Sequence, residues 1–263
     1  MTRVRTQRFD VVILAAQRDG RLDPLAAEAG VTHKCLVPIG GRPLLAHVLA
    51  ALAEVEGIGS VGISVEAGAE ALLQPLADAS GLPVRFTAAA RTLPDSVYAA
   101  AEGLEGPFVI TTADNVLLTP AAVRQVAARL AGGDDGVLAL TRKEAVLSAH
   151  PQGQRRFYRF RDGEYSNCNL YGLSRRGLAM AETFREGGQF AKNPMRLARA
   201  FGFFNLLLIR YGLVSLDRAM KRLGRRFGLK ASALVLADGA HAIDVDNERT
   251  YRIAALLMEK RAA

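Results

Sequence analysis

The first feature that could do chemistry is a polar loop between residues 17 and 34. It contains Gly20 and the cationic side chains of Arg18, Arg21 and Lys34. Backbone N–H groups and cations of this kind neutralise phosphates, so the loop is a candidate triphosphate site. A loop that simply lies in solvent explains the same residues equally well.

The second feature is the carboxylate of Asp114, in the pair Ala113-Asp114 that ends the apolar run Phe108–Thr112. Proteins hold Mg²⁺ with one or two carboxylates together with substrate phosphates, which makes Asp114 a candidate metal ligand. The alternative is a turn or helix-capping residue, because Asn115, Thr119 and Pro120 are typical of turns.

Alternating strands and helices predict that both features meet at one edge of a sheet. Short apolar runs, typical of buried strands, alternate with helical segments up to residue 141. This pattern implies a mostly parallel, Rossmann-like sheet flanked by helices, with ligands beyond the carboxyl ends of its strands. The predicted strands are Val11–Leu14, Ser60–Val65, Val84–Thr87, Phe108–Thr112 and Gly136–Thr141, and the predicted helices are Pro43–Val55, Gly68–Ala79, Ser96–Leu104 and Pro120–Leu130.

The chain after residue 141 follows a different pattern, without a linker or repeat. We expect a single α/β domain, residues 1–263, whose C-terminal half is elaborated, partly antiparallel and helical. The predicted elements there are strands at Arg155–Arg161, Tyr165–Leu173 and Leu234–Leu236, and helices at Leu178–Phe184, Pro194–Tyr211, Ser215–Gly224 and Asn247–Lys260.

The composition is that of a globular protein with an excess of positive charge. A formal net charge of +8 and a pI near 9.9 favour polyanionic partners. We expect no nucleic-acid partner, because no basic stripe carries interleaved aromatic residues. Cys35 and Cys168 lack the spacing of a zinc site or disulfide framework, and the N-terminus lacks the apolar core of a signal peptide. The expected location is cytoplasmic.

The first 45 residues carry the most specific motif. The segments Leu14-Ala15-Ala16, Gly20-Arg21, His33-Lys34 and Gly41-Arg42-Pro43-Leu44-Leu45 together resemble the signature of the sugar-phosphate nucleotidyltransferase superfamily. That superfamily includes the molybdenum-cofactor guanylyltransferases and the cytidylyltransferases. Gln17 stands where the family has a glycine, and the loop before Lys34 is longer.

This resemblance implies a glycosyltransferase-A-type (GT-A) fold and transfer of a nucleoside monophosphate from an NTP to a phosphorylated sugar, polyol or similar acceptor, with release of pyrophosphate. Residues 11–141 would bind the nucleotide, and residues 142–263 would bind the acceptor and supply a second metal ligand. The implied catalytic cations are Lys34 and Arg21, and the implied nucleotide contacts in the loop are Leu14, Ala15, Ala16, Gln17 and Gly20.

The resemblance also implies a Mg²⁺ site. Asp114 matches the Asp that ends the corresponding strand in the family and binds the metal. The late segment Asp244-Val245-Asp246 is similar to a family motif that supplies the second ligand, with Asp244 as the better match and Asp246 as the alternative. Asp246 fits equally well as the N-cap of the terminal helix.

Arg91 and Ser96 resemble a segment that lies near the base in methylerythritol-phosphate cytidylyltransferases. The similarity favours CTP as the donor, with GTP as the other candidate. A helix cap at Asp95 or Ser96 explains this segment equally well.

Acceptor contacts are implied by two further matches. In related enzymes the strand that contains Asn167 and Asn169 lines the acceptor pocket. Lys192 resembles a lysine that binds the acceptor's phosphate, and Arg196 would add positive charge beside it. For Lys192 and Arg196 the alternative is a basic loop that lies in solvent.

Two other functions are compatible with the sequence. A noncatalytic nucleotide-binding or regulatory protein on the same fold would explain Gln17 and the long loop. A peripheral, weakly membrane-associated interaction protein would explain the apolar stretch Phe201–Val214 and the basic cluster Lys221–Arg226. A core helix accounts for the apolar stretch as well.

Overall fold

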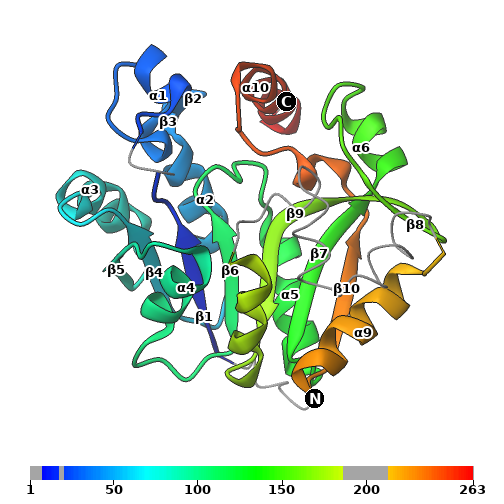
Figure 1. Ribbon diagram of the computed structural model, residues 1–263. Helices are drawn as coiled ribbons and strands as arrows, with labels where there is room; N and C mark the ends of the chain where they lie inside the picture. Colours follow the sequence, from blue (N-terminus) through cyan, green and yellow to red (C-terminus); the bar gives the residue numbers. More distant parts are fainter. Residues whose placement is uncertain (1–7, 18–20, 186–212, 263) are drawn as a thin grey trace, which may run out of the picture.

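The computed structural model describes residues 8–17, 21–185 and 213–262. An eight-stranded sheet forms its centre, with strand order β10-β7-β9-β6-β1-β4-β5 and with β8 paired to β9 (Figure 1). The strands are β1 (Phe9–Leu14), β4 (Ile58–Val65), β5 (Val84–Ala88), β6 (Phe108–Thr112), β7 (Gly136–Arg142), β8 (Tyr158–Phe160), β9 (Gly163–Leu173) and β10 (Ala231–Leu236), beside a small pair, β2 (Pro38–Ile39) and β3 (Arg42–Pro43). The helices are α1 (Pro24–Glu28), η2 (Lys34–Leu36), α2 (Leu44–Ala53), α3 (Glu70–Ser80), α4 (Leu93–Ala101), α5 (Pro120–Ala131), α6 (Lys143–Ala149), η3 (Arg176–Phe184), α9 (Leu216–Phe227), η5 (Gly239–Ala242) and α10 (Glu248–Ala262).

The predicted α/β fold with a mostly parallel sheet is confirmed. β1 runs parallel to β4 and β6, β4 to β5, and β7 to β10. β9 is antiparallel to both of its main neighbours, β6 and β7, and therefore separates two parallel groups. The sequence predicted this antiparallel strand but not its place near the middle of the sheet.

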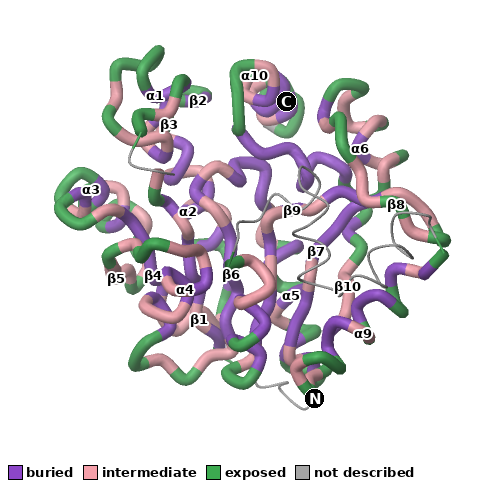
Figure 2. The backbone as a smooth tube through the Cα atoms, viewed as in Figure 1, coloured by how far each residue is buried: buried purple, intermediate pink, exposed green. Residues whose placement is uncertain are grey.

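The apolar runs of the central strands are explained by helices on both faces (Figure 2). Val11 and Ile13 belong to a buried cluster with residues of α2, α5 and α10. Val12, on the opposite face, belongs to a second cluster with residues of α4, η3 and α9. Because successive side chains of a strand point to opposite faces, a strand covered on both sides must be continuously apolar.

One local prediction needs correction, one helix was missed, and one predicted helix stays untested. α4 begins at Leu93 and its N-cap is Thr92, whose side chain accepts a hydrogen bond from the Asp95 N–H, so neither Asp95 nor Ser96 is the cap. The short helix α6 was not predicted. The predicted helix Pro194–Tyr211 lies outside the described residues, as does nearly all of the apolar stretch Phe201–Val214.

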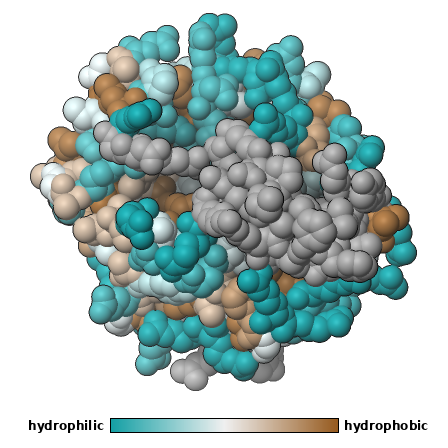
Figure 3. Space-filling view, viewed as in Figure 1, coloured by the Kyte–Doolittle hydropathy of each residue, from teal (hydrophilic) through white to brown (hydrophobic). Residues whose placement is uncertain are grey.

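The basic cluster Lys221–Arg226 lies on α9, which is strongly amphipathic. Its apolar side chains, including those of Met220 and Leu223, pack inward, and Lys221 forms an ion pair with Asp217 at 2.8 Å. Hydrophilic side chains gather over α9 and α10 on the face seen in Figure 3. In the ranges that the structure describes, no helix is both long enough and apolar enough to cross a bilayer.

Candidate active site

The polar loop leaves β1 at its carboxyl end and returns at η2, which begins with Lys34. Gln17 ties the two sides of this loop together: its Nε2 donates to the Thr32 carbonyl at 3.0 Å, and its Oε1 accepts from the Asp23 N–H at 3.2 Å. Its backbone N–H donates to Glu66 Oε1 at 2.5 Å, at the end of β4. The residue that replaces the family's glycine therefore holds the loop in place through its side chain.

Lys34 meets two of the predicted carboxylates. Its Nζ lies 2.5 Å from Asp114 Oδ2 and 3.5 Å from Asp246 Oδ1. Burial acts against the charge of Lys34, but the carboxylates of Asp114 and Asp246 outweigh it, so the pKa of Lys34 is raised. The lysine is therefore a permanent cation at the carboxyl end of the sheet.

Main-chain hydrogen bonds bring β6 and the segment before α10 to the same place. The Ala113 N–H donates to the Leu14 carbonyl at the end of β1, and the Val245 N–H donates to the Asp114 carbonyl at 3.2 Å. Asp114 is not a helix cap, because Thr119 caps α5. The topology thus joins residues more than a hundred positions apart.

Asp244 is the most deeply buried of the three carboxylates, with 5% of its surface exposed. Its Oδ2 accepts from Asn169 Nδ2 at 2.7 Å. Burial, followed by the nearby carboxylates of Asp114 and Asp246, raises its pKa well above the usual range. Such a group is neutral unless a cation compensates its charge.

The remaining oxygens fit a cation. Asp114 Oδ1 and Asp244 Oδ1 are both buried and have no hydrogen-bond partner in the structure. Within the described ranges, no three or more His, Cys, Asp or Glu side chains are grouped so as to hold a metal by themselves. One or two carboxylates completed by substrate phosphates is the arrangement that Mg²⁺ commonly adopts.

Asp246 occupies a different environment from Asp244. Its side chain is 55% exposed, and its carboxylate faces Lys34. The helix cap is its neighbour Asn247, whose Oδ1 accepts from the Thr250 N–H at 3.2 Å. The alternative of Asp246 as the N-cap is therefore wrong.

The other predicted nucleotide contacts are spread around this centre. Leu14 lines a pocket beside the three carboxylates, Ala15 is buried, and Ala16 is exposed. Arg21 is exposed and has no ion pair among the described residues. Gly20 lies outside the described residues.

The segment before α4 presents an exposed side chain and a buried one. Arg91 is exposed, whereas Ser96 is buried, with its hydroxyl bonded to the backbone N–H and C=O of Ala90. Ser96 thereby closes the turn between β5 and α4. Any contact of either residue with the base stays a prediction.

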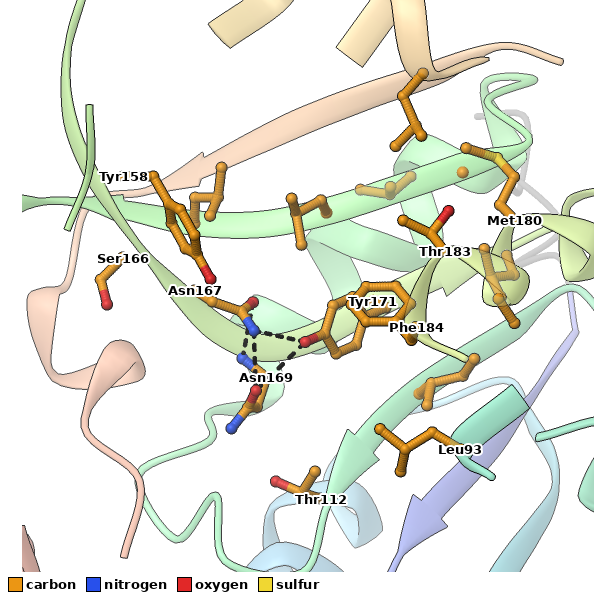
Figure 4. Close-up of a pocket in the computed structure, with 18 of the residues that line it drawn as sticks. Leu93, Thr112, Tyr158, Ser166, Asn167, Asn169, Tyr171, Met180, Thr183 and Phe184 are labelled. Atoms are coloured by element: carbon orange, nitrogen blue, oxygen red, sulfur yellow. Dashed lines mark hydrogen bonds between the residues drawn. The ribbon is translucent and has the colours of Figure 1, made fainter. Parts of the chain in front are cut away.

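A pocket of about 340 Å³ extends from the carboxylates Asp114, Asp244 and Asp246 over β9 to α9. Its polar lining includes Asn167, Asn169 and Tyr171, whose side chains are hydrogen-bonded to one another (Figure 4). The predicted acceptor residues Lys192 and Arg196 lie outside the described residues. Among the residues that the structure describes, Arg156 is the basic side chain that lines this pocket, and sequence reasoning missed both it and Tyr171.

The sequence pattern of the MobA-like NTP transferase domain family matches residues 11–201. The chain belongs to this family. As a MobA-like NTP transferase it is a nucleotidyltransferase, and the matched range contains the polar loop, Asp114 and β9.

Individual relatives agree with this assignment. The chain is 31% identical over 128 residues to a 2-C-methyl-D-erythritol 4-phosphate cytidylyltransferase of Gloeobacter violaceus, a match that covers 47% of this chain and 55% of the relative. The chain thus spans about half the length of that curated relative.

Two solved structures share the fold of this MobA-like domain. A hypothetical transferase from Thermus thermophilus is 30% identical, with a TM-score of 0.75 over 93% of this chain and 100% of that one. A 4-diphosphocytidyl-2C-methyl-D-erythritol synthase from Anaerococcus prevotii is 13% identical, with a TM-score of 0.63 over 97% of each chain, which supports the fold alone.

Proposed function

We propose that this enzyme transfers CMP from CTP to a phosphorylated small molecule in a Mg²⁺-dependent reaction in the cytoplasm. The observation that carries the proposal is the cluster of Lys34, Asp114 and Asp244 at the carboxyl edge of the sheet. CTP is favoured over GTP because the curated relative that matches at 31% identity is a cytidylyltransferase.

The chemistry needs no covalent enzyme intermediate. An oxygen of the acceptor's phosphate attacks the α-phosphorus of the nucleotide, a new P–O bond forms, and the bond to the leaving pyrophosphate breaks. Positioning and neutralisation of charge supply most of the rate in such a transfer. Lys34 would stabilise the negative charge that develops on the transferred and leaving phosphates.

The residues present fit the implied metal. Asp114 and Asp244 would hold it through their unpartnered buried oxygens, and it would neutralise phosphate charge when bound. Asp246, exposed and facing Lys34, would keep the ammonium in place.

A pyrophosphate-release screen with CTP, GTP, UTP and ATP against phosphorylated sugars and polyols, with Mg²⁺, tests the proposal. CTP with at least one acceptor should give turnover, and Lys34→Met should lower the rate about 10²- to 10³-fold. Lys260→Met, at an exposed position on α10, is the matched control. Nucleotide affinity without turnover for any acceptor would instead identify a noncatalytic binder.

A further inference from the structure

Asn169 stands at an irregular point of β9. Leu138 of β7 pairs with Tyr171 and Leu140 with Asn167, so residues 168–170 stand opposite Ala139 alone. Asn169 has a φ of 45°, in the left-handed region that asparagine tolerates better than most residues. Bulges of this kind re-aim side chains beside active sites. Here the bulge turns the Asn169 amide toward Asp244, 75 residues further along the chain.

The amide oxygen of Asn169, opposite the nitrogen that donates to Asp244, is also hydrogen-bonded. Its Oδ1 accepts from Asn167 Nδ2 at 2.9 Å and from the Tyr171 hydroxyl at 3.3 Å. Asn167 Nδ2 also donates to the Tyr171 hydroxyl at 2.5 Å, and the Tyr171 ring packs edge-on against Phe184 with ring centroids 5.2 Å apart. Figure 4 shows these three side chains converging inside the pocket.

The direction of these hydrogen bonds has a consequence for Asp244. Asn167 presents an N–H donor to Asn169, so a rotated Asn169 amide would place its NH₂ group against that donor and its oxygen against the Asp244 carboxylate. The contact between the two NH₂ groups of Asn167 and Asn169 would be repulsive, as would that between the Asn169 oxygen and the ionised, metal-binding form of Asp244. The network therefore fixes the Asn169 N–H toward Asp244 Oδ2 and leaves Asp244 Oδ1 free.

We propose that Asn169, oriented by Asn167 and Tyr171, is a positioning residue that holds Asp244 with one oxygen available for a divalent cation. This role deepens the proposed function and rests on it. It differs from the sequence expectation that Asn167 and Asn169 contact the acceptor, since the hydrogen-bonding groups of Asn169 are directed at protein partners.

Binding of Mn²⁺ to the full chain, measured by titration calorimetry without substrates, tests the proposal independently of turnover. Asn169→Gly keeps the left-handed backbone accessible and removes the amide. It should weaken Mn²⁺ binding about 10-fold or more, the usual effect of losing a group that orients a metal ligand. Tyr171→Phe keeps the ring against Phe184 and should weaken binding about two- to fivefold, the effect of one hydrogen bond.

Thr183→Val is the matched control, because the Thr183 hydroxyl lines the same pocket, is buried and has no hydrogen-bond partner in the structure. Its Mn²⁺ affinity should equal that of the wild type. Circular dichroism of each variant checks the fold, and Tyr171→Phe keeps the test valid if Asn169→Gly does not fold.

Kinetics separate positioning from acceptor contact. In Asn169→Gly the metal concentration for half-maximal pyrophosphate release should rise, while the acceptor KM at saturating metal should stay unchanged. A raised acceptor KM with unchanged Mn²⁺ affinity would overturn the proposal and make Asn169 an acceptor contact. A wild type that neither binds Mn²⁺ nor releases pyrophosphate would overturn the proposed function as well, whereas an active wild type with unaffected variants would overturn the positioning role alone.

Discussion

The site draws the carboxylates of Asp114 and Asp244 from two segments that hold them in opposite ways. At the end of β6, Asp114 lies 2.5 Å from the ammonium of Lys34. In the segment before α10, Asp244 has the neutral amide of Asn169 as its hydrogen-bond partner and two other carboxylates nearby. Charge is compensated by a directly bonded cation at Asp114, whereas Asp244 has no cation bonded to it. Because a buried charge without a partner is costly, the second segment is the one that calls for a bound cation.

The largest effect on activity is expected at Asp114, whose charge is compensated by Lys34. Asp114→Asn removes the partner of Lys34 and a predicted metal ligand together, so pyrophosphate release should fall about 10³-fold or more. The main-chain bond from Val245 to the residue-114 carbonyl would remain, which should keep the fold. Asp78→Asn, on the exposed surface of α3, should leave the rate unchanged. A fully active Asp114→Asn enzyme would remove Asp114 from the site.

Replacing Asp244, the carboxylate without a bonded cation, should raise the stability of the metal-free protein and lower its function. The pKa of Asp244 is raised, so above about pH 4 the unfolded chain ionises this group while the metal-free folded protein keeps it protonated. The unfolded state then binds fewer protons, and the stability contributed by Asp244 falls as pH rises toward the folded pKa. Asp244→Asn cannot ionise and escapes this loss.

Metal-free Asp244→Asn should therefore melt a few degrees above the wild type at neutral pH, with the gap shrinking toward pH 4. Mn²⁺ should raise the melting temperature of the wild type and not that of the variant. Differential scanning fluorimetry over this pH range measures both effects. A variant that melts below the wild type at pH 7.5 without metal would show that Asp244 is already compensated within the protein.

The same contrast separates what the sequence could and could not predict. The first segment follows from local pattern: an apolar strand, a polar loop and an Asp two residues after Thr112 specify a carboxyl-edge site. The second depends on contacts between distant residues. Neither the bulge at Asn169 nor its bond to Asp244 leaves a periodic signal, and Tyr171 looked like one more strand residue.

The start of α4 did have a local sequence signal, whereas the missed helix α6 did not. Thr92 and Asp95 form the Thr-x-x-Asp spacing of a capping box, which identifies the start of α4 three residues before the predicted one. α6 is a short helix, Lys143–Ala149, beyond the point where strand and helix stop alternating. Seven residues are too few for helical periodicity to stand out.

A moderate effect is expected where the two segments are tied together. His241 is buried, with Nε2 2.9 Å from Thr119 Oγ1, in the connection after β6, and Nδ1 3.0 Å from the Asp238 carbonyl. Burial lowers the pKa of His241 although Asp238 opposes the shift. As pH falls below about 6.5, the unfolded chain binds a proton that the folded protein resists, so this stability is lost toward acid.

His241→Gln should remove that dependence. Between pH 7 and pH 5.5 the melting temperature of the metal-free wild type should fall about 2–4 °C more than that of the variant, equivalent to about 1 kcal/mol. His150→Gln, at the C-cap of α6, is the control. Parallel curves for wild type and His241→Gln would show that His241 titrates as it does in the unfolded chain.

The smallest effect is expected in the polar loop, where the uncharged side chain of Gln17 holds the loop through hydrogen bonds. Gln17→Ala removes the bonds to Thr32 and Asp23, one of them exposed, and should lower the free energy of unfolding by about 0.5–1 kcal/mol. Since the loop would then have to be ordered on binding, the KM for the nucleotide should rise about three- to tenfold while kcat stays the same. Gln74→Ala, on the surface of α3, controls for loss of an exposed glutamine. If the KM of Gln17→Ala is unchanged, the side chain stabilises the fold without preparing the loop for the nucleotide.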